Sequence, residues 1–131
     1  MDEEQANKGL AVDFSQIFLN GFSNFPVNDI EKINEFVKHL SVHGFENLPG
    51  RNKPSDNVPT DDHEFIEKVK YAQDNNLHHY HIGIPHFDQS GEHGDWTSEY
   101  ILHYMHLDSS IKIVDMGSHP PFSLPAEEYL K

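Results

Sequence analysis

The chain has 131 residues, the size of one domain, and carries 22 Asp and Glu against 9 Lys and Arg, for a formal net charge of −13 with histidine neutral. It has 11 histidines and a single arginine, Arg51, and it has no cysteine, which excludes disulfides, thiolate nucleophiles and cysteine-ligated zinc. No apolar run is long enough to span a membrane, and the acidic N-terminal sequence is unlike a secretory signal, so we expect a cytoplasmic protein. The charge argues against a surface that grips a nucleic-acid backbone by itself, since that needs clustered Lys and Arg.

The first part of the chain predicts a strand followed by two helices. Residues 11–14 read as a short strand, and apolar residues spaced by three, four and three predict a helix over Asp29–His43. Three prolines and two glycines in residues 44–60 predict a loop. A second helix, capped at residues 60–62, would end near residues 74–76.

After residue 76 the apolar period changes from helical to two. Alternating residues predict strands at Leu77–Ile84, Glu99–Leu107 and Ile111–Gly117. A Gly-rich polar loop over residues 85–98 joins the first two, and the tight turn at Asp108–Ser110 predicts an antiparallel hairpin for the last two.

These elements predict an α+β fold of order β-α-α-β-β-β, in which a small antiparallel sheet carries helices packed on one face. We expect a disordered acidic tail over residues 1–9, a single domain over residues 10–122 and a C-terminal tail over residues 123–131.

Histidine is concentrated in the second half, where eight of the eleven follow residue 70. His79 and His81 are two apart on a strand and therefore share a face, opposite the face that carries Tyr80 and Ile82. On the next strand, an inward face of Tyr100, Leu102 and Tyr104 would place His103 beside the two histidines.

The parity of the last strand is less constrained. Ile111 and Ile113 indicate an inward face shared with Asp115, which leaves Lys112 and Val114 outward, and a shift of one residue would reverse the assignment.

The spacing leaves three interpretations of this face open. Imidazoles that titrate near working pH can take a proton from a 2′-hydroxyl and give one to a leaving oxygen, which is acid–base chemistry without a cofactor. A His-x-His strand also suits zinc or nickel. The third interpretation is a solvated polar face whose histidines hydrogen-bond across strands.

Four segments carry a resemblance to a known family: HGFENLPGRN (residues 43–52), LHHYHIGIP (residues 77–85), SEYILHYMHL (residues 98–107) and IKIVDMGSHPPF (residues 111–122). With the order of elements, they resemble bacterial type II toxin–antitoxin toxins of the RelE/ParE superfamily, most closely the YafO-like toxins. The resemblance covers roughly residues 10–122. It implies a RelE-like fold and a ribosome-dependent mRNA endoribonuclease (an mRNA interferase) without a cofactor, held inactive by an antitoxin.

In such toxins RNA lies on the open face of the sheet. The positions that match are His79, His81, His103, Asp115 and His119, with His79 or His81 expected as the base and His119 as the acid or a phosphate contact. Further candidates for substrate binding are Lys112, Arg51 and, if the middle strand has the other parity, Tyr104.

The sequence departs from this family in its charge, because residues 71–131 hold 2 Lys and Arg against 9 Asp and Glu. Positive charge on the histidine face would have to come from protonated imidazoles, whose pKa values nearby carboxylates would raise. The alternative function is that of an acidic immunity or antitoxin-like protein, a non-enzyme that neutralises a basic toxin by charge complementarity.

Overall fold

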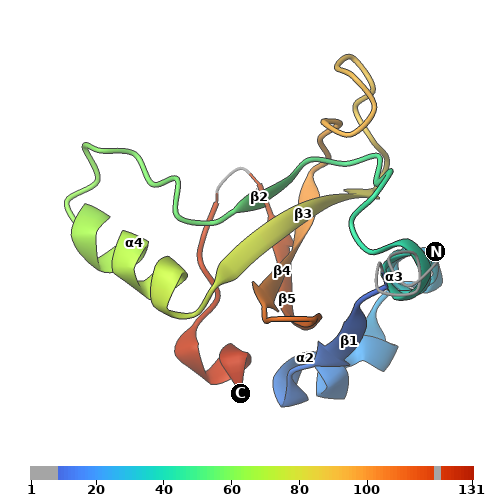
Figure 1. The fold of residues 1–131 in the computed structure, drawn as a ribbon, viewed down its shortest axis with the longest axis horizontal. Coiled ribbons are helices and arrows are strands. Elements are labelled where there is room, and N and C mark those ends of the chain that lie inside the picture. The colour runs from blue at the N-terminus through green and yellow to red at the C-terminus, as the bar shows by residue number, and fades with distance from the viewer. Residues whose placement is uncertain (1–8, 120–121) are drawn as a thin grey trace, which may run out of the picture.

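The computed structural model describes residues 9–119 and 122–131, and it confirms an α+β fold with three helices and a mostly antiparallel five-stranded sheet (Figure 1). The predicted acidic tail lies outside the described residues, apart from Gly9. The elements, in chain order, are β1 (Ala11–Phe14), α2 (Gln16–Gly21), the 3-10 turn η1 (Phe22–Asn24), α3 (Val27–His43), β2 (Asn52–Pro54), α4 (Phe65–Asp74), β3 (Leu77–Ile84), β4 (Tyr100–His106), β5 (Ser110–Ser118) and the 3-10 turn η2 (Glu127–Leu130).

The strands are ordered β1-β5-β4-β3-β2 across the sheet. The antiparallel pairing of β3, β4 and β5 confirms the predicted hairpin sheet. Two features correct the sequence prediction. β1 pairs in parallel with β5, with Val12 opposite Ile111, so the sheet is mixed. The loop predicted over residues 44–60 contains β2, which extends the sheet beyond β3.

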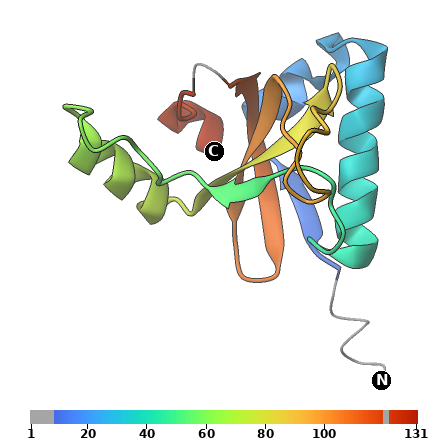
Figure 2. The same cartoon turned by 90° about the horizontal axis from the view of Figure 1, so that it is seen from above.

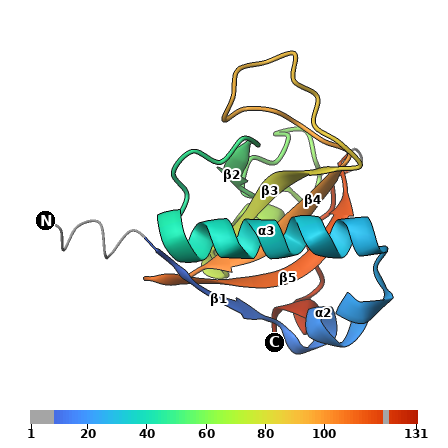
Figure 3. The same ribbon diagram turned by 90° about the vertical axis from the view of Figure 1, so that its right-hand side faces the viewer.

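The long helix α3 lies across one face of the sheet (Figures 2 and 3). Its buried stripe of Ile33, Phe36 and Leu40 packs on the inward side chains of β3, β4 and β5 as the periodicity predicts, and the rings of Phe36 and Tyr80 stack with centroids 4.6 Å apart. The helix ends at Gly44, whose φ of +62° is a left-handed conformation that favours glycine. No helix within the described ranges is long and apolar enough to cross a membrane.

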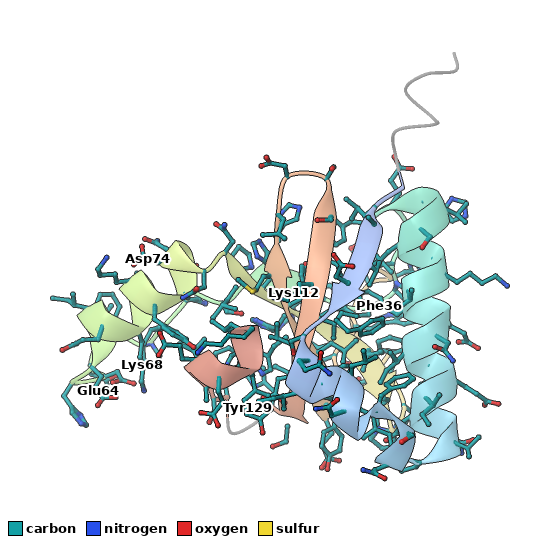
Figure 4. The ribbon with its side chains drawn as sticks, turned by 90° about the horizontal axis from the view of Figure 1, so that it is seen from below. Phe36, Glu64, Lys68, Asp74, Lys112 and Tyr129 are labelled. Atoms are coloured by element: carbon teal, nitrogen blue, oxygen red, sulfur yellow. The ribbon has the colours of Figure 1, made fainter. Side chains whose placement is uncertain are left out.

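The opposite face carries a second, smaller apolar cluster, in which Leu77 of β3 and Val114 of β5 pack with Ala72 of α4 and Leu130 of η2. Figures 2 and 4 show α4 and the C-terminal segment on the side of the sheet away from α3. Residues 123–131, expected to form a C-terminal tail, contribute Leu124 and Leu130 to this cluster. The end of this segment is fixed by Lys112, whose ammonium group donates to the carbonyl oxygens of Leu130 and Lys131.

A β-bulge in β5 settles the face of Asp115. The register of β4 against β5 shifts between His103 opposite Asp115 and Tyr104 opposite Ile113, so Val114 is an extra residue. Asp115 therefore lies on the histidine face, which corrects the expectation that it shares the inward face of Ile111 and Ile113.

The role of the α3 stripe in stability is testable with two substitutions in that helix. Leu40 is 0 % exposed, so Leu40→Ala leaves a cavity and should lower the free energy of unfolding by about 2–5 kcal/mol in urea denaturation. Val42 is 58 % exposed, and Val42→Ala should change it by less than about 0.5 kcal/mol. Equal effects of the two substitutions would contradict this packing.

Candidate functional site

Three imidazoles from two parts of the chain converge on the face opposite α3. His79 and His81 project from β3, and His119 directly follows β5. One ring nitrogen of each lies within 4.8 Å of the others. The ring centroids are 6.2 Å apart for His79 and His81, 5.9 Å for His79 and His119, and 5.5 Å for His81 and His119. We call these three residues the histidine centre.

Hydrogen bonds orient the two strand histidines. The Nδ1 of His79 lies 2.9 Å from the hydroxyl oxygen of Ser55, a buried residue that directly follows β2. The Nδ1 of His81 lies 3.0 Å from both the carbonyl oxygen and the backbone nitrogen of Ser98. When Nδ1 donates to the carbonyl, Nε2 keeps its lone pair. The Nε2 atom of each ring is thus left for chemistry.

The histidine centre lies where two cavities meet. The larger, of about 980 Å³, runs between the β2–α4 segment and the C-terminal residues, and the smaller, of about 450 Å³, lies beside the β3–β4 loop. Arg51, His81 and His119 line both. The Nε of Arg51 donates to Asp95 across 2.7 Å, so the one guanidinium of the chain is held beside the imidazoles. Together the two cavities form a groove that an extended ligand can occupy.

His103 and Asp115 lie next to this centre but deeper. His103 pairs with His79 on one side and Asp115 on the other, and it is 2 % exposed. Its Nδ1 has no hydrogen-bond partner among the described residues. The ring of Phe122 covers His79, His103 and His119 with centroids 4.9, 5.7 and 5.1 Å away. The C-terminal segment thus shields part of the face that the sequence predicts to be open.

Burial keeps these imidazoles neutral. For His79, burial and, after it, the neighbouring imidazoles lower the pKa to about 3. For His103, burial and the nearby His119 lower the pKa to about 4. The pKa values of His81 and His119 are also lowered, chiefly by burial. The expectation that nearby carboxylates raise these pKa values is wrong in its net effect. Asp95 does raise the pKa of His81, but burial outweighs it, and Asp115, half-buried on this face, has a raised pKa of its own.

Two further candidates lie outside the site. Tyr104 faces α3, because β4 has the parity that places His103 on the opposite face, and its hydroxyl donates to Asn52 across 2.6 Å. Lys112 holds the C-terminal residues through two carbonyl oxygens (Figure 4). Neither side chain is available to a substrate in the groove.

Three residues that the sequence analysis did not select contribute to the site. Ser55 orients His79, Phe122 covers the imidazoles, and Asp95 holds Arg51. Ser55 directly follows the three-residue strand β2, and Asp95 lies in the β3–β4 loop, so no periodicity predicts where their side chains point. Phe122 lies in the segment IKIVDMGSHPPF, and its position three residues after His119 is the only feature of the sequence that indicates a contact with the histidines.

The comparisons with known proteins add no identity, since no protein-family model, curated protein or solved structure matches the chain. The fold and site define a small α+β protein with a partly buried three-histidine centre.

The neutral imidazoles predict a stability that falls with acidification. In the unfolded chain a histidine has a pKa of about 6.5. His79 and His103 have lower pKa values when folded, so the unfolded state binds more protons and stability is lost as the pH falls below about 6.5. For each of these two histidines, the free energy of unfolding measured by urea denaturation should fall by about 2 kcal/mol between pH 7 and pH 5.

The variant His103→Gln separates this effect from general acid sensitivity. Glutamine does not titrate, so the loss between pH 7 and pH 5 should shrink by about 2 kcal/mol, although the variant is itself less stable at pH 7. The raised pKa of Asp115 offsets only part of the loss, because protonating that carboxyl favours the folded state. An unchanged pH dependence in the variant would show that His103 is not buried neutral.

Proposed function

We propose that the chain is an endoribonuclease and that the histidine centre cleaves RNA by acid–base chemistry. The observation that carries the proposal is the convergence of three neutral imidazoles and the one arginine on a groove. The resemblance to YafO-like toxins of the RelE/ParE superfamily supports the same chemistry. It names mRNA on the ribosome as the substrate and an antitoxin protein as the partner.

The proposed reaction is an internal transesterification. The Nε2 of His81 takes the proton of a 2′-hydroxyl, because burial lowers the pKa of His79 to about 3 and makes His79 a weak base. O2′ then bonds to the adjacent phosphorus, and the bond from phosphorus to the 5′-oxygen breaks. The proton returns to the 5′-oxygen through an imidazolium of the centre, with His119 as the donor nearest solvent. The products are a 2′,3′-cyclic phosphate and a 5′-hydroxyl, so protons balance without a metal or a cofactor.

The groove offers contacts to the phosphate and to the bases. Arg51 lies beside His81 and His119, where it can pair with the phosphate charge. The larger cavity also holds Lys53, Lys68 in an ion pair with Asp62, and the aromatic rings of Tyr71 and Phe122, on which bases can stack. Carboxylates line the two cavities as well: Asp62, Glu67, Glu127, Asp88 and Glu99. These few cations fit a nuclease that takes much of its RNA affinity from the ribosome.

The scarcity of carboxylates on the strands supports this function over the acidic binding protein that the sequence also suggests, although carboxylates of the helices and loops line the groove. Within the described residues, the five strands carry only Asp13 and Asp115, and the other carboxylates lie on helices, turns and loops. A surface that neutralises a basic toxin would place acidic residues on the exposed sheet face. The net charge of −13 is the observation that supports the acidic binding protein.

Removal of His119 tests the cleavage. His119→Ala should lower the rate on ribosome-bound mRNA by about 10²–10⁴-fold in a Mg²⁺ buffer whose transition metals are removed by a selective chelator, because it removes one proton-transfer group. A single 2′-deoxynucleotide at the cleaved position should block the wild-type enzyme. The control is His93→Ala, an exposed histidine in the β3–β4 loop that packs on Trp96, and it should keep the wild-type rate.

Growth gives the matching measurement in cells. Expression of the wild type without a partner should arrest growth, and His119→Ala should relieve the arrest. Harmless expression of the wild type, together with stable binding of a basic protein at low salt, would favour the acidic binding protein instead.

The role of Arg51 is tested by Arg51→Gln. Loss of a charged hydrogen bond to phosphate should lower kcat/KM by about tenfold or more. Asp95→Asn serves as the matched variant, because it removes the ion pair but leaves the guanidinium in place. A wild-type kcat/KM in Arg51→Gln would remove Arg51 from the proposed mechanism.

A further inference from the structure

The histidine centre also has the composition of a metal site. Three ring nitrogens lie within 4.8 Å of one another, and no thiolate or carboxylate belongs to the group. Three histidines with the groove on their open side form the ligand set that proteins use for zinc when a fourth position is left to water or a ligand. Hard cations such as Mg²⁺ and Ca²⁺ prefer oxygen ligands instead.

The hydrogen bonds behind the rings fit the same role. Histidines that bind a metal through one nitrogen usually donate a hydrogen bond from the other, which fixes the tautomer and the ring orientation. His79 has the hydroxyl of Ser55 at its Nδ1. His81 has both the carbonyl oxygen and the backbone N–H of Ser98 there, and a hydrogen bond donated to that carbonyl leaves Nε2 as the metal ligand. Each partner belongs to a buried residue, so both rings are oriented before any ligand arrives.

The strand β3 fixes two of the three ligands before any metal arrives. His79 and His81 lie two residues apart on β3, which pairs with β2 on one side and with β4 on the other.

We propose that His79, His81 and His119 form a binding site for one divalent transition metal ion, with Zn²⁺ as the best fit. The proposal does not depend on RNA cleavage, because it concerns binding alone. A bound ion would occupy the lone pairs that the proposed nuclease uses to accept a proton, so metal occupancy would suppress metal-free cleavage.

The experiment must distinguish zinc binding at this site from zinc binding at other histidine pairs. His39 and His43 lie one turn apart on α3 with ring centroids 5.2 Å apart, and His78 and His106 are 5.3 Å apart on the α3 side of the sheet. Two exposed imidazoles one turn apart also bind zinc, but they offer two ligands instead of three. The matched control is therefore His43→Ala.

The experiment is calorimetric titration of the chelator-treated full chain with ZnCl₂ and, separately, MgCl₂. The wild type should bind one Zn²⁺ tightly, bind no Mg²⁺, and gain about 5–10 °C in Tm when free Zn²⁺ exceeds the Kd by about a hundredfold. His119→Ala should weaken the tight site by about a hundredfold or more, and His43→Ala should leave it unchanged. Because His119 lies outside the strands, its substitution should preserve the Tm of the metal-free protein.

Ser55→Ala provides a second, independent variant. It keeps all three ligands but removes the hydroxyl behind His79, and it should weaken Zn²⁺ binding by about 10–100-fold. Absence of Zn²⁺ binding by the wild type, equal affinity in His119→Ala, or loss of the tight site in His43→Ala would each overturn the proposal. RNA cleavage is measured separately, with Mg²⁺ present and transition metals removed by a selective chelator, so failure of one proposal leaves the other testable.

Discussion

The strict alternation of β3 is the constraint on which the rest of the structure depends. Tyr80 and Ile82 must face α3, because that helix has no other apolar surface to bury its stripe against, and this places His79 and His81 on the opposite face. A register shift of one residue would bury two imidazoles under α3 and expose the residues that hold the helix. The position of the histidine centre is thus fixed by the packing of the core on the other side of the sheet.

The second face is neither an open polar surface nor a full hydrophobic core. α4 and the C-terminal segment cover one end of it with the cluster around Val114 and Leu130, while the groove reaches the imidazoles at the other end. Partial cover of this kind has a cost, because imidazoles lose water without gaining a full set of partners. The Nδ1 of His103 is an example, since no group among residues 9–119 and 122–131 forms a hydrogen bond with it. The stability of the apolar core on the α3 side offsets that cost.

Much of the fold could be predicted from periodicity alone. β3 was predicted at its observed bounds, and α3 within two residues, because both are long and strongly periodic. Periodicity has no information on β2, whose three residues are too few to show alternation. It also missed the parallel pairing of β1, which the contact with β5 decides, and the bulge at Val114 that turns Asp115 toward the histidines.

The candidate site was predicted in part. The shared face of His79, His81 and His103 follows from the two-residue period, and the convergence of His119 with them depends on how the chain leaves β5, which no local pattern encodes. Protonation was predicted wrongly for a physical reason. The sequence shows how many carboxylates are near in the chain, but the pKa values depend on burial, and the segment that supplies it, around Phe122, is recognised only once folded.

The neutrality of the histidine centre changes what the charge of the molecule means. A surface that depends on protonated histidines would gain anion affinity on mild acidification, whereas buried imidazoles with lowered pKa values do not supply that charge. The positive charge beside the centre is instead the guanidinium of Arg51, which is charged at every accessible pH and is held by Asp95. What the imidazoles offer is a set of lone pairs, oriented from behind by Ser55 and Ser98. A proton and a transition metal ion compete for such lone pairs, so under the two proposals the availability of metal, and not the net charge of the chain, would decide which chemistry this face performs.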